Sequence, residues 1–258
     1  MIELKTAHEI ALMRQAGRVV AELLSYLSGA VRPGMKTRLL DEEARTYLRK
    51  AGVVSAFFGY RGFPAAICVS VNEEVVHGIP GERTIRKGDL VSLDAGVILE
   101  GWYADAATTV PVGSVTPAAR RLMDTTRRAL EEGIAQAVIG NRLSDISHTV
   151  QRVAEQAGFG VVRDFVGHGI GQALHEDPPI PNFGPPHMGP RLKAGMVLAL
   201  EPMVTAGSHE VQVLADGWTA VTQDRLLAAH FEHTVAITEH GPQVLTAAEP
   251  HDAKRRPD

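Results

Sequence analysis

The sequence has a single cysteine, few aromatic residues and no long apolar run. Cys68 has no intrachain partner, which excludes an internal disulfide and favours a reducing compartment. No apolar stretch approaches the roughly 20 residues that a membrane-spanning helix needs. Charged residues interrupt the N-terminal stretch throughout, so it is not a signal peptide. These absences favour a cytoplasmic protein with no membrane contact.

A strong charge imbalance is also missing. The formal net charge is -4, so no basic field draws the protein to nucleic acid, and the short "AKRRP" near the C-terminus is too little to do so. Hydrophobic residues make up 45% of the 258 residues and charged residues 22%, the balance of an ordinary globular protein. The chain has ample material for a core. The polar residues 249–258 are expected to form a flexible tail.

The N-terminal region has the pattern of an amphipathic helix. Thr6 and Glu9 have the spacing of a capping box, in which each side chain bonds the other's backbone N–H. One face of the predicted helix is apolar or small, and it comprises Ile10, Met13, Gly17, Val20, Leu24 and Leu27. We therefore expect this helix to pack against a core.

The chain resembles itself at an offset of 106 to 107 residues. The stretch at 34–52 matches the one at 140–158 in length, flanking glycines and apolar pattern, and a helical pattern precedes each. Further along, "GDLVSLD" (88–94) aligns with "GMVLALE" (195–201), which places Asp94 on Glu201. We predict two helix–helix–strand halves, at about 1–110 and 111–248, related by a pseudo-twofold axis.

The remaining pattern is that of short strands separated by glycine turns. The predicted strands are 66–71, 90–98, 102–110, 196–204, 210–214 and 231–238. Two helices and several mostly antiparallel strands per half predict an α+β protein, with a central sheet covered by helices on its outer face. Carboxylates from both halves could then converge on the inner face.

Two aspartates, Asp94 and Asp105, lie within the apolar stretch 91–110. A buried carboxylate is costly unless it is paired or binds a metal ion, and a loop position or an arginine partner is the plainer alternative. A turn at Leu99 and Glu100 places the two aspartates directly opposite each other in a hairpin. A turn at Glu100 and Gly101 makes them diagonal neighbours. Either arrangement puts them on one face.

Close carboxylates repel each other unless cations lie between them, and two divalent ions bridged by carboxylates are the usual solution in hydrolytic enzymes. Three further candidate ligands lie on small or strand-like stretches: His168, Glu201 and Glu232. Two divalent cations would neutralise four carboxylates. A set rich in oxygen with one imidazole suits Mn, Co or Fe(II) better than structural zinc. Taken singly, each residue also fits a turn, a strand end or a solvated edge.

With these residues in place, the chain resembles the type I methionine aminopeptidases of the creatinase-like "pita-bread" superfamily (M24 type). The matching stretches are "GYRGFPAAICVSVNEEVVHGIP", "LVSLDAGVILEGWYADAATT", "VGHGIGQALHEDP", "GMVLALEPM" and "DGWTAVTQDRLLAAHFEHTVAIT". They extend over about residues 59–238. The resemblance implies the pita-bread fold, with an internal pseudo-twofold and a curved sheet, in a single catalytic domain over residues 1–248.

The resemblance also implies roles for particular residues. Asp94 would bind one metal ion, Asp105 and Glu232 would bridge both ions, and His168 and Glu201 would complete the second site. Water bridging the two ions would be the nucleophile, with Glu201 as general base. His77 and His175 would hydrogen-bond the scissile amide and the oxyanion.

An apolar pocket for the methionine side chain follows from the same resemblance. Its expected residues are Tyr60, Phe63, Cys68, Trp218, Phe57 and Leu174. Phe57 stands where some members have cysteine, and Leu174 where some have phenylalanine. Arg61 replaces a histidine near the pocket mouth, which bears on how the second or third substrate residue is received.

The sequence therefore predicts a metal-dependent methionine aminopeptidase that removes the initiator methionine from nascent chains, with a small second residue preferred. Nascent N-termini are the expected partners, with transient proximity to the ribosome, and the protein is expected to be a monomer. An X-Pro dipeptidase or aminopeptidase of the same fold is the enzymatic alternative, although "NEEVVHGIP" is typical of the methionine enzymes. A non-catalytic binding homologue is the other alternative, and the complete ligand set disfavours it.

Overall fold

The structure is a computed structural model that describes residues 2–247. The expected tail, 249–258, lies outside the described residues. Four α-helices occur in the described part, together with one short 3-10 helix, η1: α1 (Ala7–Ala30), α2 (Thr37–Ala51), η1 (Tyr60–Gly62), α3 (Pro117–Ala135) and α4 (Leu143–Gln156). Within residues 2–247 no helix is both long and apolar enough to span a bilayer.

The centre of the molecule is a nine-stranded antiparallel sheet with the order β1-β4-β5-β14-β9-β7-β8, on which β2 pairs with β4 and β15 with β14. Its strands are β1 (Val54–Ser55), β2 (Cys68–Val71), β4 (Leu90–Leu99), β5 (Trp102–Pro111), β7 (Gly167–Gly169), β8 (Glu176–Ile180), β9 (Val197–Leu200), β14 (Glu232–Thr238) and β15 (Gly241–Val244). Two small sheets flank it, with the orders β13-β10-β6 and β11-β12-β3. Their strands are β3 (Glu74–Val76), β6 (Gly160–Val161), β10 (Met203–Thr205), β11 (Val211–Val213), β12 (Ala220–Thr222) and β13 (Ala228–His230).

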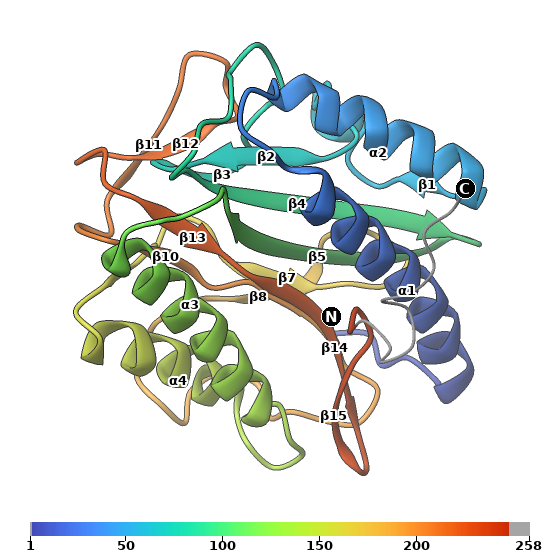
Figure 1. The fold of residues 1–258 in the computed structure, drawn as a ribbon. Helices are drawn as coiled ribbons and strands as arrows, with labels where there is room; N and C mark the ends of the chain where they lie inside the picture. The colour runs from blue at the N-terminus through green and yellow to red at the C-terminus, as the bar shows by residue number, and fades with distance from the viewer. Residues whose placement is uncertain (1, 248–258) are drawn as a thin grey trace.

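The helices form one layer against the sheet. Helix α1 packs on β4 and β5, whereas α3 contacts β9, β10 and β13. Figure 1 shows α1 and α2, in blue, over one part of the sheet and α3 and α4, in green, over the other. Alternation along the strands supplies the apolar face: Leu93 and Ala95 of β4 join the core beneath α1, and Val235 of β14 joins the core beneath α3 and α4. The residues that alternate with these three along the strands, such as Asp94, therefore point to the other face of the sheet.

Helix α1 begins as the sequence predicts. Thr6 is its N-cap, and its side chain and that of Glu9 form the reciprocal bonds of a capping box. All six residues of the predicted apolar face are buried. Gly17 lies so close to the backbone at Leu245 that an added Cβ would be 2.3 Å from the Leu245 carbonyl oxygen. Close approach explains the glycine on this face.

The predicted internal repeat is present in the fold. Each half contributes two helices and then strands of the shared sheet, and α2 and α4 occupy the matched stretches. An isolated backbone bridge precedes each of these helices, at Lys36–Thr84 in the first half and Arg142–Arg191 in the second. Both partners of one bridge align with those of the other at the offset found in the sequence. The α+β fold with a pseudo-twofold is confirmed.

The hairpin of β4 and β5 resolves the two turn alternatives. Leu99 pairs with Trp102, so the turn consists of Glu100 and Gly101. Both have positive φ angles, 51° and 82°, which is the geometry of a type I′ turn. Gly96 is opposite Asp105, and Asp94 is therefore its diagonal neighbour. The second of the two registers is the one adopted.

One predicted strand differs from the structure. The sequence predicts a continuous strand over 196–204, but the stretch divides into β9 and β10, which belong to different sheets. Glu201 and Pro202 lie at the division. Proline has no N–H to donate to a ladder, so the pairing of the sheet cannot continue through it. The break leaves Glu201 at the end of β9.

Candidate metal centre

The strand register places the first three candidate ligands on one face of the sheet. Ala107 of β5 lies between Asp94 of β4 and Glu232 of β14, because it is paired with both. Directly paired residues point to the same face, and so do residues two apart on one strand. Asp105 therefore shares that face with Asp94 and Glu232. This is the face opposite the helices.

The second half of the chain supplies the other two ligands to the same face. Leu200 pairs with His233, so Glu201 follows at the position next to Glu232. His168 of β7 pairs with Ala199, which lies two residues before Glu201. The antiparallel registers thus bring all five predicted residues together, although they come from four strands and one strand end.

The side chains converge closely. Asp105, His168 and Glu232 each offer a ligand atom, and these three atoms lie within 4.8 Å of one another. His168 Nε2 is 3.5 Å from Glu201 Oε1. Asp94, Asp105, His168 and Glu232 are each less than 9% exposed. The cluster is therefore compact and lies largely out of contact with water.

The electrostatics of the cluster are unfavourable for bare carboxylates. Burial raises the pKa of Asp94 to about 7. Burial, followed by repulsion from neighbouring carboxylates, raises the pKa of Asp105, Glu201 and Glu232 well above the ordinary values. Without cations, these groups are driven to bind protons.

The donor atoms fit divalent cations. Asp94 Oδ1 and Asp105 Oδ1 are buried and have no hydrogen-bond partner in the protein, which is costly for a carboxylate and is relieved by metal coordination. His168 Nδ1 lies 2.9 Å from the Gly169 carbonyl oxygen. A carbonyl only accepts, so Nδ1 carries the proton and Nε2 keeps its lone pair toward the cluster. Burial, followed by His175, lowers the pKa of His168 to about 4, which keeps the ring neutral.

His77 lies at the end of β3, in the left-handed region with a φ of 58°. Its ring makes edge contacts with Phe165 and Trp218, at centroid distances of 5.3 and 6.2 Å. Burial, and next the neighbouring His175, lowers its pKa to about 4. His77 is therefore a neutral donor or acceptor held between aromatic rings.

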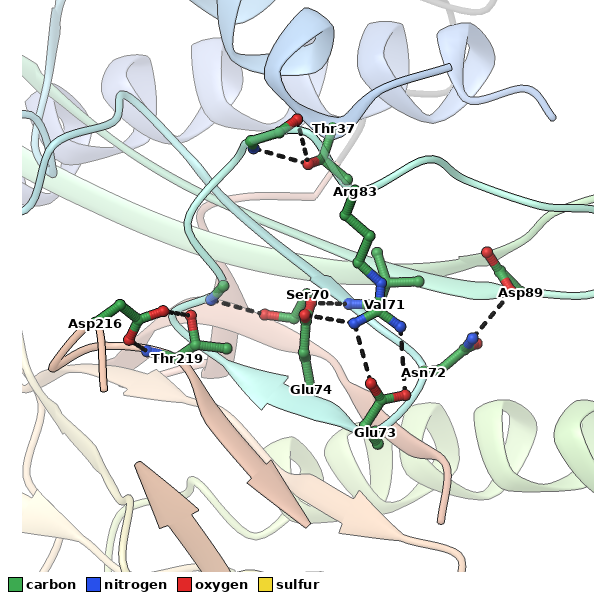
Figure 2. Close-up of polar contacts among 12 residues, drawn as sticks. Thr37, Ser70, Val71, Asn72, Glu73, Glu74, Arg83, Asp89, Asp216 and Thr219 are labelled. Carbon is green, nitrogen blue, oxygen red and sulfur yellow. Dashed lines mark hydrogen bonds and ion pairs between the residues drawn. The ribbon is translucent and has the colours of Figure 1, made fainter. Parts of the chain in front are cut away.

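The loop that follows His77 is held by a polar network (Figure 2). Ser70 Oγ accepts a hydrogen bond from the Gly78 N–H at 3.1 Å, in a buried position. Arg83 pairs with Glu73 and Glu74 at the turn between β2 and β3. Asp216 accepts from Trp218 N–H and from Thr219, which fixes the loop bearing Trp218. None of these supporting residues is itself a predicted site residue, yet they fix the ones that are.

His175 directly precedes β8 and lies beside His168. Its ring is 4.2 Å from that of His168, and its Nδ1 is 2.8 Å from the Tyr60 hydroxyl. Burial, and next the charge of Arg61, lowers its pKa. Arg61 is exposed, has a φ of 48° and lies 5.4 Å from the Tyr60 ring centroid. These three residues lie together, with Arg61 and His175 exposed to solvent.

The structure gathers the predicted pocket residues into one apolar cluster. Its buried members and the partly buried ones packed against them include Phe57, Phe63, Cys68, Leu174, Tyr60 and Trp218. Cys68 of β2 pairs with Asp94, so the pocket adjoins the carboxylates. The Phe57 ring lies over Gly96, where an added Cβ would be 2.9 Å from it. Glycine at 96 therefore makes room for the larger side chain at 57.

Several residues that support the site are not predicted by the sequence. His230, at the end of β13, is 1% exposed and lies 3.9 Å from Glu201. Lys5 pairs with Glu176, beside His175. The sequence offers one signal for His230, which is its place two residues before Glu232 in "HFEHTVAI". The pairing of Lys5 with Glu176 has no local signal.

Comparisons with known proteins agree with this geometry. The model of metallopeptidase family M24 matches residues 11–239. Methionine aminopeptidase 1 of Bacillus subtilis is 52% identical over 246 residues, which cover 95% of this chain and 99% of the relative. Methionine aminopeptidase 1 of Mycobacterium tuberculosis is 47% identical, with 94% of each chain covered.

Solved structures place the chain in the same group. The methionine aminopeptidase of Thermotoga maritima has a TM-score of 0.94 and 46% identity, and covers 96% of this chain and 100% of its own. The prolidase of Pyrococcus furiosus has a TM-score of 0.78 and 22% identity, and 66% of it is covered, so it shares the fold alone. With the family model matching most of its length and relatives near half identity, the chain belongs to metallopeptidase family M24, in its group of methionine aminopeptidases.

Proposed function

We propose that this protein removes the initiator methionine from the N-termini of nascent polypeptides and prefers substrates with a small second residue. The observation that carries the proposal is the convergence of five ligand residues from both halves on one buried face. The relatives near half identity, which are named methionine aminopeptidases, support the same activity. As a metallopeptidase of family M24, the protein depends on divalent metal.

The proposed cofactors are two divalent ions, such as Co, Mn or Fe(II). Asp94 would bind one ion, and His168 and Glu201 would bind the other. Asp105 and Glu232 would bind both ions. When bound, the ions supply Lewis-acid polarisation and lower the pKa of water. Four carboxylates and one imidazole match hard to intermediate divalent cations, and the metal present in the cell follows from availability.

The surrounding side chains have separate tasks in the proposed reaction. Glu201 would accept the proton of the attacking water, as a carboxylate at the edge of the candidate metal cluster. His175 Nδ1 accepts a hydrogen bond from the Tyr60 hydroxyl, which leaves its Nε2–H to donate to the oxyanion. His77 would hydrogen-bond the substrate amide. Both histidines are held neutral by burial.

The apolar cluster beside Asp94 is the proposed methionine pocket. Its walls would be Phe57, Phe63, Cys68 and Leu174, with Tyr60 and Trp218 at the edge. A flexible thioether fills an irregular apolar space well, and contact with aromatic rings adds to its binding. Phe57 enlarges and Leu174 reduces the wall relative to the family pattern, so methionine preference is retained with an altered shape.

The wider setting is proposed on the same basis. All seven polar site residues come from one chain, which supports an active monomer and a single catalytic domain over residues 1–248. A nascent-chain substrate supports a cytoplasmic location and transient proximity to the ribosome. No nucleic-acid partner is proposed, since the net charge is -4.

Release of methionine from Met-Ala-Ser tests the proposal. Metal-stripped protein should be inactive and should recover with Co or Mn. Asp105→Asn keeps the volume of the side chain but removes a bridging charge. We expect at least about 100-fold lower kcat/KM, since replacing a residue that only orients a metal ligand already costs about 10- to 100-fold. Glu100→Gln, at the exposed turn of the same hairpin, is the matched control and should retain full activity.

Ala-Pro and Lys-Pro peptides provide the contrast in specificity. Cleavage of these peptides in place of Met-Ala-Ser would assign the protein to the proline-specific branch. Binding of metal without cleavage of any peptide would assign it to the non-catalytic homologues. Either result contradicts the proposed function.

A further inference from the structure

His230 is the most deeply buried ionisable group near the site that the proposed reaction does not use. Its side chain is 1% exposed, and neither Nδ1 nor Nε2 has a hydrogen-bond partner in the protein. A buried polar group without a partner costs about 1–3 kcal/mol. A role in the metal-loaded protein would account for such a group.

The backbone of His230 is fixed in place. Its N–H donates to Thr109 Oγ1 at 2.9 Å, and the Thr109 hydroxyl donates to its carbonyl oxygen at 2.8 Å. Thr109 lies on β5, two residues beyond Ala107 and on the face of the candidate ligands. On its other side His230 pairs with Met203 of β10. The ring is therefore held at the edge of the metal cluster by two strands.

The nearest charged neighbour of the ring is the carboxylate of Glu201. His230 Nε2 lies 3.9 Å from Glu201 Oε2, while His168 Nε2 lies 3.5 Å from the other oxygen, Oε1. Glu201 is thus flanked by two imidazoles, one on each oxygen. The hydrogen bond that Asn182 donates to Glu201, at 3.0 Å, goes to its backbone carbonyl and leaves the carboxylate to its two imidazole neighbours. A hydrogen bond to His230 would require Oε2 to move closer to Nε2 than the present 3.9 Å.

The chemistry of the two groups is complementary. An imidazole ring carries at least one N–H whether it is neutral or charged, so His230 can present an N–H at Nε2. His168 has its Nδ1–H committed to a carbonyl, which leaves Nε2 as an acceptor and ligand. Of the two imidazoles beside Glu201, only His230 can therefore donate an N–H to its carboxylate.

We propose that His230 is a positioning residue for Glu201: its Nε2–H donates to Oε2 and so fixes the carboxylate in the orientation that binds metal with His168. The inference rests on the proposed metal site. Residues that hydrogen-bond a metal ligand orient it and raise its affinity for the metal. The role requires a hydrogen-bond donor at position 230 but not a titrating one.

The test compares His230→Gln, which keeps a donor, with His230→Leu and His230→Met, which do not. Binding of Mn to metal-stripped protein is measured by calorimetry, together with the visible absorption spectrum of the Co-loaded protein. We expect about 10-fold weaker Mn binding or more in the Leu and Met variants, the usual loss for an outer-shell partner. The Gln variant should bind within a few-fold of the wild type and keep its Co spectrum.

His233→Leu is the matched control. His233 is partly buried, but it points to the helix side of β14, where its Nδ1 lies 2.9 Å from Thr246 Oγ1. Removing it should leave Mn affinity and the Co spectrum unchanged. Thermal unfolding of each variant verifies that binding is measured on folded protein, and the Met variant, with its flexible side chain, replaces the Leu variant if the latter unfolds.

Equal Mn affinity in the wild type and in the Leu and Met variants would overturn the inference, and so would equal weakening in the Gln and Leu variants. In both cases the proposed function would stand if the wild type binds Mn and cleaves Met-Ala-Ser. Failure of the wild type to bind any divalent ion would overturn the metal site itself and the role of His230 with it.

Discussion

Four carboxylates buried on one face of a sheet dominate the residue-scale energetics of this protein. Asp94 and Asp105 are diagonal neighbours, and each keeps an oxygen with no protein partner. Replacing water by such surroundings favours the protonated form, which raises the pKa of each group. The site therefore lowers the folding stability of the metal-free protein, and divalent ions would restore it.

This cost predicts that the folding stability of the metal-free protein depends on pH. Burial raises the pKa of Asp94 from 3.8, the ordinary value of an aspartate, to about 7, so the folded state binds more protons between these values. The contribution of Asp94 to stability therefore falls as pH rises from about 4 to 7 and is constant above. Buried neutral histidines such as His168 have the opposite dependence, so the effect must be isolated by a variant.

The variant Asp94→Asn isolates the pH-dependent contribution of Asp94 to folding stability, because the amide does not titrate. Urea unfolding of metal-stripped wild type and variant, at intervals between pH 4 and 9, gives the difference in free energy of unfolding. We expect the variant to gain stability relative to wild type as pH rises to about 7, after which the gap stays level. A gap independent of pH would contradict the raised pKa of Asp94.

At the scale of the element, α1 depends on one close contact. The helix crosses the backbone near Leu245 at Gly17, where any Cβ would overlap the Leu245 carbonyl. Gly29 lies in the same helix, is exposed, and has no atom within 4 Å of the place of its Cβ. Adding a side chain at these two positions of the same helix should therefore have opposite effects on folding stability.

Substitution of each by alanine should separate these effects. Gly17→Ala forces α1 or the chain at Leu245 to move, and we expect a loss of about 1–3 kcal/mol, as for other overpacked sites. Gly29→Ala removes backbone freedom without a clash and should gain up to about 1 kcal/mol. Urea denaturation measures both, and similar changes in the two variants would refute the close contact.

At the scale of the whole molecule, the first residues of the chain bind to segments of the second half. The Lys5 N–H donates to the Gly195 carbonyl at 2.7 Å, and its ammonium pairs with Glu176. Glu176 also accepts the backbone N–H groups of Gln172 and Ala173, at 2.8 and 3.2 Å. The N-terminal segment therefore shapes the loop that ends in His175.

Lys5→Met tests this link between the halves. The Lys5 side chain is 5% exposed, and loss of one partner from such a buried pair costs about 3–5 kcal/mol. We expect faster amide hydrogen exchange in residues 171–176 and a lower kcat on Met-Ala-Ser, with Mn affinity retained. Lys36→Met, which breaks the exposed pair with Glu82, is the control and should change stability by less than about 1 kcal/mol.

The pseudo-twofold is a further property of the whole molecule. Asp94 and Glu201 align in the internal repeat and lie on the same face of the shared sheet. Asp94 lies within β4, and Glu201 directly follows β9. The five candidate ligands thus come from both halves of the chain, and neither half supplies all of them.

Much of this arrangement follows from the sequence itself. The capping box at Thr6, the apolar face of α1 and the β4–β5 hairpin are local patterns, and the repeat at about 106 residues is read directly by aligning the chain with itself. The spacing of Asp94 and Asp105 about a central turn likewise puts both carboxylates on one face in either of the two possible registers. These features depend on contacts within short stretches or on spacing alone.

Tertiary structure decided the rest. The hairpin register is still a local choice, because the turn at Glu100 and Gly101 selects it. The break at Glu201, in contrast, depends on the departure of β10 to another sheet. The neighbourhood of His230 and the pairing of Lys5 with Glu176 join segments that are far apart in the chain. No periodicity records such contacts, because burial and charge pairing across distant segments arise only when the sheets and helices pack.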